Sequence, residues 1–349
     1  MHRDDLRVLP KVLLHEHLDG GLRPGTLLEL ADACRYPGLP RDEPESLATW
    51  FDQRGSGSLV RYLEAFAHTV AVMQTPDALA RVAREEVEDL AADGVVYAEV
   101  RFAPSLHLQD GLSRSEVIAA VLEGTGEGVA ATGIEVRIIV DAMRHDTDAE
   151  EVVAAAAPFL GRGVVGFDLA GPEAGFPARE HRRAIDAARD AGFRLTIHAG
   201  EADGPSSIAD ALDCGAERIG HGVRIIDDCR VRDGEVVEAG PVAARVVLQD
   251  AALEICPTSN LGTGAFPSAS AHPIGMLHRA GFPVTINTDN RLMSRTSMTD
   301  EFGLVVGHHA FELGDLRAVT LRAVDAAFCD DATRSAVRRR VEAGYDPLS

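Results

Sequence analysis

The chain has 349 residues, 46% of them hydrophobic, which is enough for one large barrel domain or two ordinary domains. It carries 34 basic and 55 acidic residues, a formal net charge of -21 at pH 7. A chain this acidic repels phosphate backbones and anionic lipids, so its composition argues against nucleic acid and membranes as partners and favours a neutral or cationic small molecule.

The first ten residues contain no apolar run of the kind found in secretory signals, and no stretch approaches the roughly 18 apolar residues of a membrane span. The five cysteines are scattered without CxxC spacing, so a disulfide framework is not expected. We therefore expect a cytoplasmic protein with reduced thiols. The sequence leaves its oligomeric state open.

Eight short segments rich in β-branched and apolar residues recur along the chain, and each ends in polar or small residues. These predicted strands are Val12–Asp19, Val95–Pro104, Glu135–Asp141, Val164–Gly171, Arg194–Glu201, Arg218–Val223, Leu253–Asn260 and Val284–Asn290. Stretches with helical spacing separate most of them. They include Arg114–Ala131, Ala149–Phe159, Ala178–Ala191, Pro241–Ala251 and Ile274–Ala280. Strands that alternate with helices eight times predict a parallel (β/α)8 barrel of the TIM type.

A doubly wound open sheet is the alternative fold. It is disfavoured because no GxGxxG follows any strand, and because polar residues close many strands rather than gathering at one switch point. We expect one barrel domain over residues 1–349. Residues from about 22 to 93 form a helical insertion after the first strand, which includes Thr26–Cys34 and Leu59–Val72. We interpret this insertion as a lid, expect extra helices at the C-terminus, and interpret the acidic run Glu85–Glu88 as a solvated helix face.

The polar residues at the strand ends indicate where chemistry takes place. Side chains two apart on a strand point to one face, so His15, His17 and Asp19 share a face of the first strand. A histidine or carboxylate that closes an apolar strand is expensive to bury without a partner. Three further strands end in this way, with His198 and Glu201, with His221, and with Asp289 and Asn290.

Three neutral imidazoles and one carboxylate suit a zinc ion, although iron, cobalt or nickel fits the same donors. We expect one ion per chain, which would lower the pKa of a bound water from about 16 toward about 7. Glu201 lies three residues past His198, so it can reach the reaction centre without binding the metal. His221 can hold the water or deprotonate it, which is general acid–base work.

Six motifs together make the pattern specific. They are HEHLDGGLRP at 15–24, DLAGPE at 168–173, HAGE at 198–201, RIGHG at 218–222, CPTSN at 256–260 and NTDN at 287–290. Their order and spacing, across essentially the whole chain, resemble those of the adenosine deaminase family. The resemblance implies hydrolytic deamination of adenosine and 2'-deoxyadenosine, which yields inosine and ammonia from adenosine, in purine salvage.

The resemblance also implies roles for single residues. The zinc ligands would be His15, His17, His198 and Asp289. Glu201 would protonate N1 of the purine. His221, helped by Asp289, would orient and deprotonate the water.

Other residues would bind the nucleoside. Gly171 would offer its backbone N–H to N3, Asp19 would bind the ribose, and His17 would also face the substrate. An apolar helix over the nucleoside would present Leu59, Tyr62, Leu63 and Phe66. The spacing of these four residues also fits an ordinary packed helix, so substrate contact and lid packing both stay open.

One position departs from the family pattern. The family commonly has a second aspartate after the ligand aspartate, which donates a hydrogen bond to N7, and here the residue is Asn290. An amide NH2 donates without having to be protonated, so the role survives chemically. The change nevertheless loosens the inference of adenosine over other 6-aminopurine substrates.

Three alternatives remain. A related enzyme could act on adenine or on aminodeoxyfutalosine, although Asp19 and the lid helix favour a ribose-bearing substrate. An AMP deaminase would need a basic phosphate cradle, against which the acidic balance argues. A catalytically inactive binding homologue would not need the intact metal ligands, Glu201 and His221. The H-x-E…P-C-x-x-C signature of polynucleotide deaminases is absent.

Overall fold

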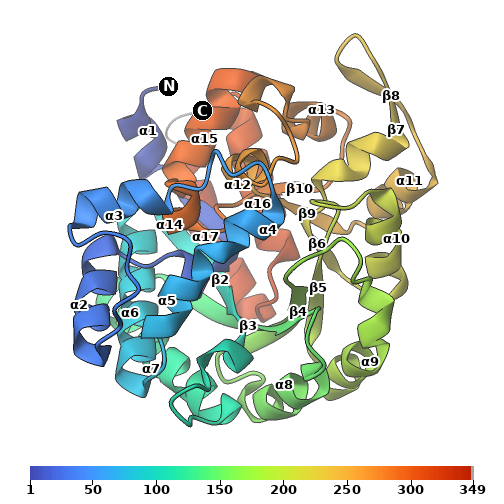
Figure 1. Ribbon diagram of the computed structural model, residues 1–349. Coiled ribbons are helices and arrows are strands. Elements are labelled where there is room, and N and C mark those ends of the chain that lie inside the picture. Colours follow the sequence, from blue (N-terminus) through green and yellow to red (C-terminus); the bar gives the residue numbers. More distant parts are fainter. Residues whose placement is uncertain (347–349) are drawn as a thin grey trace.

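The computed structural model describes residues 1–346, and its centre is a ring of eight parallel strands (Figure 1). The expected domain range of 1–349 extends to residues 347–349, which lie outside the described part. In ring order the strands are β1 (Lys11–His17), β2 (Val95–Phe102), β3 (Glu135–Met143), β4 (Val164–Ala170), β5 (Arg194–Ala199), β6 (Arg218–His221), β9 (Ala252–Ile255) and β10 (Val284–Ile286).

The ring closes between β1 and the segment that follows β10. A parallel bridge pairs Glu16 with Asp289. The His17 N–H donates to the carbonyl of Asp289 at 2.7 Å, and the Asp289 N–H donates to the carbonyl of His15 at 2.9 Å. The predicted (β/α)8 barrel is therefore confirmed over the open doubly wound sheet, because a closed ring has no edge strands.

Helices surround the ring on the outside (Figure 1). Those that connect successive barrel strands are α7 (Arg114–Thr132), α8 (Ala149–Ala156), α9 (Arg182–Ala191), α10 (Pro205–Asp213), α11 (Pro241–Leu248) and α13 (Ile274–Arg279). The other helices outside the first crossover are α1 (Arg3–Val8), α12 (Pro257–Gly262), α14 (Arg291–Ser294), α15 (Met298–His309), α16 (Leu313–Ala326) and α17 (Asp331–Tyr345). In the described part of the chain, no helix combines the length and hydropathy that crossing a membrane requires.

The first crossover contains five helices. They are α2 (Pro24–Cys34), α3 (Pro44–Phe51), α4 (Leu59–Glu64), α5 (Phe66–Val72) and α6 (Pro76–Ala92). The stretch predicted as one helix over Leu59–Val72 is two, which meet at Ala65. Short helices α4 and α5 lie over the end of the barrel at which the strands finish, where their side chains line a cavity together with residues from the strand ends.

Two features of the crossovers differ from the sequence-based expectation. The sixth crossover carries an antiparallel hairpin, β7 (Cys229–Arg232) and β8 (Glu235–Ala239), which was not predicted. The strand predicted over Leu253–Asn260 ends at Ile255, because Pro257 begins α12. Proline fits the first turn of a helix, where its missing N–H has no partner to lose.

The interpretation of Glu85–Glu88 as a solvated face is wrong for its first two residues. Glu85 is 7% exposed and Glu86 is 3% exposed. Glu86 pairs with Arg291, which also lies 3.1 Å from Glu16 of β1. This buried group ties α6 of the insertion to the barrel.

Candidate active site

Four side chains from distant parts of the sequence converge where the barrel strands end. They are His15 and His17 of β1, His198 of β5, and Asp289, which follows β10. One nitrogen or carboxylate oxygen from each residue lies within 4.8 Å of those of the others. Barrel closure therefore brings the predicted ligand set together.

The contacts around these rings direct their Nε2 atoms toward one point. His15 Nδ1 lies 2.9 Å from Glu254, whose ionised carboxylate only accepts, so this nitrogen holds the proton of the neutral ring. Its Nε2 is buried without a hydrogen-bond partner, 3.2 Å from Asp289 Oδ1. The Nε2 atoms of His17 and His198 face each other at 3.2 Å. A metal ion that replaced the proton between these two nitrogens would be held by the same donors together with His15 and Asp289, so the donor set fits a metal ion.

A carboxylate lies behind each of the three rings. Besides Glu254 of β9 behind His15, Asp141 of β3 lies 3.4 Å from His17 Nδ1. Asp168 of β4 lies 2.9 Å from His198 Nδ1. Carboxylates in this position fix the tautomer and the orientation of a ligand imidazole and increase its basicity. Neither Glu254 nor Asp141 was singled out from the sequence.

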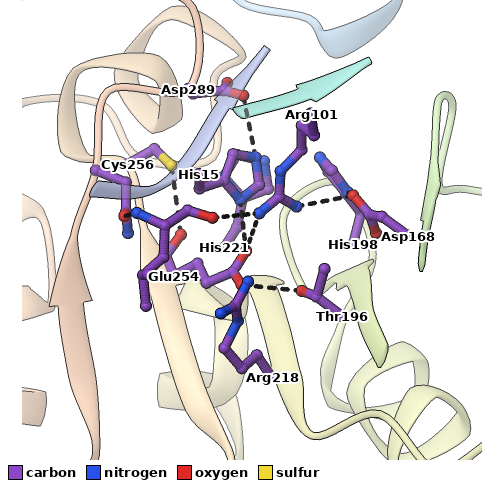
Figure 2. Close-up of polar contacts among 12 residues, drawn as sticks. His15, Arg101, Asp168, Thr196, His198, Arg218, His221, Glu254, Cys256 and Asp289 are labelled. Carbon is purple, nitrogen blue, oxygen red and sulfur yellow. Dashed lines mark hydrogen bonds and ion pairs between the residues drawn. The ribbon is translucent and has the colours of Figure 1, made fainter. Parts of the chain in front are cut away.

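Buried arginines hold two of these carboxylates, Glu254 and Asp168, in place (Figure 2). Arg101 of β2 donates to Asp168 at 2.7 Å and to Glu254 at 2.8 Å. Arg218 of β6 donates to Glu254 at 2.6 Å, and Thr196 donates to the same carboxylate at 3.0 Å. All these groups are buried, and each of the four charged ones has an oppositely charged partner inside the barrel.

The environment controls the charge of the three imidazoles. Burial lowers the pKa of His15 and lowers the pKa of His198 to about 3, so both rings are neutral. Burial acts in the same direction on His17, but the hydrogen bond and charge of Asp141 outweigh it and raise the pKa of His17 to about 9. A metal ion at this point would therefore displace a proton from His17.

Two of the predicted residues have strained backbones. His221, the last residue of β6, has φ of 60°, and Asp289 has φ of 65°. A left-handed φ is uncommon for residues other than glycine, and such strain clusters where a side chain must be aimed at a functional site. Both residues turn their side chains into the space that the strand ends enclose.

A cavity of about 290 Å³ opens beside the four convergent side chains. Its wall contains all the residues that were predicted to contact substrate, namely His17, Asp19, Leu59, Tyr62, Leu63, Phe66, Gly171 and Asn290. It also contains His198, Glu201, His221 and Asp289, whereas His15 is fully buried behind the wall. Within residues 1–346, no lysine or arginine lines this cavity.

Glu201 is held at the wall by its neighbours. The carboxylate of Glu173, in the loop after β4, accepts the backbone N–H groups of residues 200 to 203 at 2.5 to 3.1 Å. Glu201 Oε1 accepts from Thr263 Oγ1 at 2.9 Å and from Asn260 Nδ2 at 3.4 Å. Burial raises the pKa of Glu201, which favours the protonated acid.

Asn290 lies at the rim of the cavity and is 3% exposed. Its Oδ1 has no hydrogen-bond partner and packs on Gly20. A Cβ at position 20 would lie 2.1 Å from this oxygen, so only glycine leaves room for the Asn290 amide. Close by, the Tyr62 hydroxyl pairs with Ser294 Oγ at 2.7 Å and fastens α4 to the segment after β10.

Sequence reasoning missed part of the wall and all of its internal support. Val70, Leu106, Met143 and His145 also line the cavity. Buried charges inside apolar strands were an available signal, as with Glu99 and Arg101 in β2 and Glu254 in β9. Their partners depend on which strands the closed ring places side by side, and the sequence alone does not give that.

Comparison with known proteins shows to which family the sequence and the fold are similar. The sequence profile of the adenosine deaminase family matches residues 10–344. An adenosine deaminase from Mycobacterium leprae is 51% identical over 344 residues, which is 97% of this chain and 95% of that protein. The crystal structure of an adenine deaminase from Arthrobacter aurescens superimposes with a TM-score of 0.85 at 25% identity, covering 96% of this chain and 98% of that one.

A zinc-bound amidohydrolase from Burkholderia ambifaria superimposes with a TM-score of 0.86 at 27% identity, covering 99% of this chain and 93% of that one. The profile match spans nearly the whole chain, and the M. leprae relative shares half of its residues. The chain therefore belongs to the adenosine deaminase family.

Proposed function

We propose that this chain deaminates adenosine and 2'-deoxyadenosine by hydrolysis at a zinc ion held by His15, His17, His198 and Asp289. One observation carries the proposal. Two buried imidazole nitrogens, a third from the partly buried His17, and a carboxylate oxygen meet at the wall of a cavity that also holds Glu201. Three nitrogens and one oxygen are a donor set that suits zinc, and the B. ambifaria neighbour has zinc bound.

A zinc ion bound at this position would lower the pKa of the water molecule that attacks the purine from about 16 to about 7. The chain's own residues do the rest. His221 and Asp289 hold the water and one of them takes up its proton, Glu201 delivers a proton to N1, and the Gly171 N–H binds N3. The water oxygen bonds to C6, and the proton taken from the water passes to the amino nitrogen. The bond from C6 to that nitrogen then breaks to release ammonia, and the second proton of the water returns to Glu201, so that a carbonyl forms at C6.

The composition of the cavity supports a nucleoside over a nucleotide. Asp19 is buried at the wall, where its carboxylate can accept from a ribose hydroxyl and would repel a 5'-phosphate. The absence of lysine and arginine from the described wall leaves a phosphate without a cationic partner. The A. aurescens neighbour is an adenine deaminase, which keeps the free base as the second candidate.

We further propose that the chain functions as one barrel domain with residues 22–93 as its lid. The apolar residues Leu59, Leu63 and Phe66 line the cavity from α4 and α5. In this position they exclude water from the purine and cover the nucleoside.

The experiment is a comparison of kcat/KM for ammonia release from adenosine, 2'-deoxyadenosine, adenine, AMP and aminodeoxyfutalosine. Adenosine and 2'-deoxyadenosine are expected to be the best substrates. If adenine or AMP were best, the nucleoside assignment would be wrong. A protein that turned over none of the five would be the inactive binding homologue.

A further inference from the structure

A chain of buried polar side chains runs from His221 away from the cavity. His221 Nδ1 lies 3.1 Å from Asn260 Nδ2, and Asn260 Oδ1 lies 3.3 Å from His272 Nε2. His272 Nδ1 lies 3.2 Å from the backbone N of Ile274. The exposed fractions of His221, Asn260 and His272 are 2% or less, so the protein itself satisfies these groups.

The contact between His272 and Ile274 fixes the direction of the hydrogen bonds from His272 to His221. A backbone N–H only donates, so His272 Nδ1 accepts from Ile274 and carries no proton. The proton of neutral His272 is then on Nε2, which donates to Asn260 Oδ1. With its oxygen turned to His272, the Asn260 amide presents its NH2 to His221.

The Asn260 amide in turn fixes the position of the proton on His221. An amide NH2 only donates, so His221 Nδ1 accepts from Asn260 and carries no proton. The proton of a neutral His221 is therefore on Nε2, which lies 3.5 Å from Glu201 Oε2. Asn260 also donates to Glu201 Oε1, so one amide orients both the proton donor and His221.

We propose that His272 and Asn260 are positioning residues that hold His221 with its proton on Nε2, as a hydrogen-bond donor toward the reacting water. The inference rests on the proposed function, in which His221 acts on that water. His221 could either hold the water or deprotonate it. Because its Nε2 already carries a proton, it can only hold the water. The water's proton then goes to Asp289.

The direct test is 15N NMR of the zinc-loaded protein with labelled histidine, in which the signals of His221 are assigned by their loss in His221→Gln. The expected spectrum shows a protonated Nε2 and an unprotonated Nδ1. A protonated Nδ1 in the wild-type protein, in either the other neutral tautomer or the cation, would overturn the inference. The spectrum does not depend on turnover, whereas failure to deaminate adenosine would overturn the proposed function instead.

Variants test the two positioning residues separately. Asn260→Asp places a carboxylate beside Nδ1, which draws the proton there. Its kcat is expected to fall about 100-fold, with KM within about threefold of wild type, because the group that is lost acts on the reacting atoms. The NMR signals of its His221 should show a protonated Nδ1, and an unchanged His221 spectrum would contradict the role of Asn260.

His272 offers a matched pair of substitutions. His272→Gln keeps one acceptor for Ile274 and one donor for Asn260, and should stay within about threefold of wild-type kcat, whereas His272→Leu keeps neither and should lose about 10- to 100-fold. His309→Leu is the control, since the ring of His309 lies 6.2 Å from that of His272 but takes no part in the hydrogen bonds between His272, Asn260 and His221. Equal kcat in His272→Gln and His272→Leu would contradict the role of His272.

Discussion

At the scale of single residues, the proposed chemistry depends most on Glu201. Its loop is held by Glu173, and its Oε1 is held by Thr263 and Asn260, so the side chain is oriented before a substrate arrives. Burial raises the pKa of Glu201 and so keeps a proton available for N1. Groups that are fixed in this way lose little entropy in the reaction.

Glu201→Gln should abolish proton delivery while keeping the shape of the side chain. General acid–base groups contribute about 10²–10⁴-fold, so kcat for adenosine should fall at least about 100-fold. Metal analysis is the control, because Glu201 does not belong to the ligand set and the variant should retain its zinc. A zinc-loaded variant within about threefold of wild-type kcat would exclude Glu201 as the proton donor.

Recognition of the purine N7 by Asn290 can be tested with an analogue that lacks this nitrogen. If its amide donates to N7, 7-deazaadenosine leaves the donor unpaired in a closed site, at a cost of about 1–3 kcal/mol. That cost corresponds to a loss of roughly five- to 150-fold in kcat/KM. Because removal of N7 also changes the reactivity of the ring, Asn290→Ala is the control. The preference for adenosine over the 7-deaza analogue should shrink in this variant, and an unchanged preference would show that Asn290 does not contact N7.

At the scale of elements, the barrel strands position the site and the insertion closes it. The eight strands were predictable because each apolar run stops at polar residues, and the ligands were predictable because they stand at those stops. The residues behind the ligands were not. Glu254 supports His15 only because ring closure places β9 near β1, and a local pattern contains no such information.

Two local signals were present in the sequence and were overlooked or misinterpreted. Asp233 and Gly234 both have positive φ in the β7–β8 turn, and an Asp-Gly pair between alternating residues is typical of a tight hairpin. Glu86 stands in an acidic run that predicted solvent exposure. Its burial depends on Arg291, which arrives from the other end of the chain.

The insertion can be tested at Phe66. If its ring covers the nucleoside, Phe66→Ala removes binding that is equal in the ground state and the transition state. KM should then rise about tenfold, because part of the apolar area that the nucleoside buries against the ring is lost. The kcat should stay within about threefold of wild type. Val60→Ala is the control, since Val60 lies on the neighbouring helix α4 but is 62% exposed and outside the cavity wall. A lower thermal stability with unchanged KM would indicate that Phe66 only packs the lid.

At the scale of the whole molecule, a chain of buried charges crosses the interior of the barrel. It runs from Glu99 through Arg218, Glu254 and Arg101 to Asp168, and so links β2, β6, β9 and β4. The Arg218 guanidinium also lies 3.6 Å from the centroid of the Phe328 ring, in the segment between α16 and α17. The support of the metal site and the stability of the barrel therefore depend on the same residues.

Arg218→Met should destabilise the protein strongly, because it leaves the buried Glu99 without its cationic partner and removes one of the two arginines that pair with Glu254. The expected loss in the free energy of unfolding is about 3–5 kcal/mol, measured by urea denaturation. Arg338→Met removes an ion pair with Asp325 in which both side chains are about a third or more exposed, and should cost at most about 1 kcal/mol. Equal effects of the two variants would contradict the structural role of the buried chain.

The most direct test of the central claim is a titration of metal-free protein with zinc, in which ammonia release from adenosine is measured at each step. The metal-free protein is expected to be inactive, and its activity should rise in proportion to added zinc until about one ion per chain is bound. His17→Ala, which removes one donor, should bind no zinc at the stoichiometric point and remain inactive. Full activity of the exhaustively chelated protein, or no turnover of adenosine by the zinc-loaded protein, would contradict zinc-dependent deamination of adenosine.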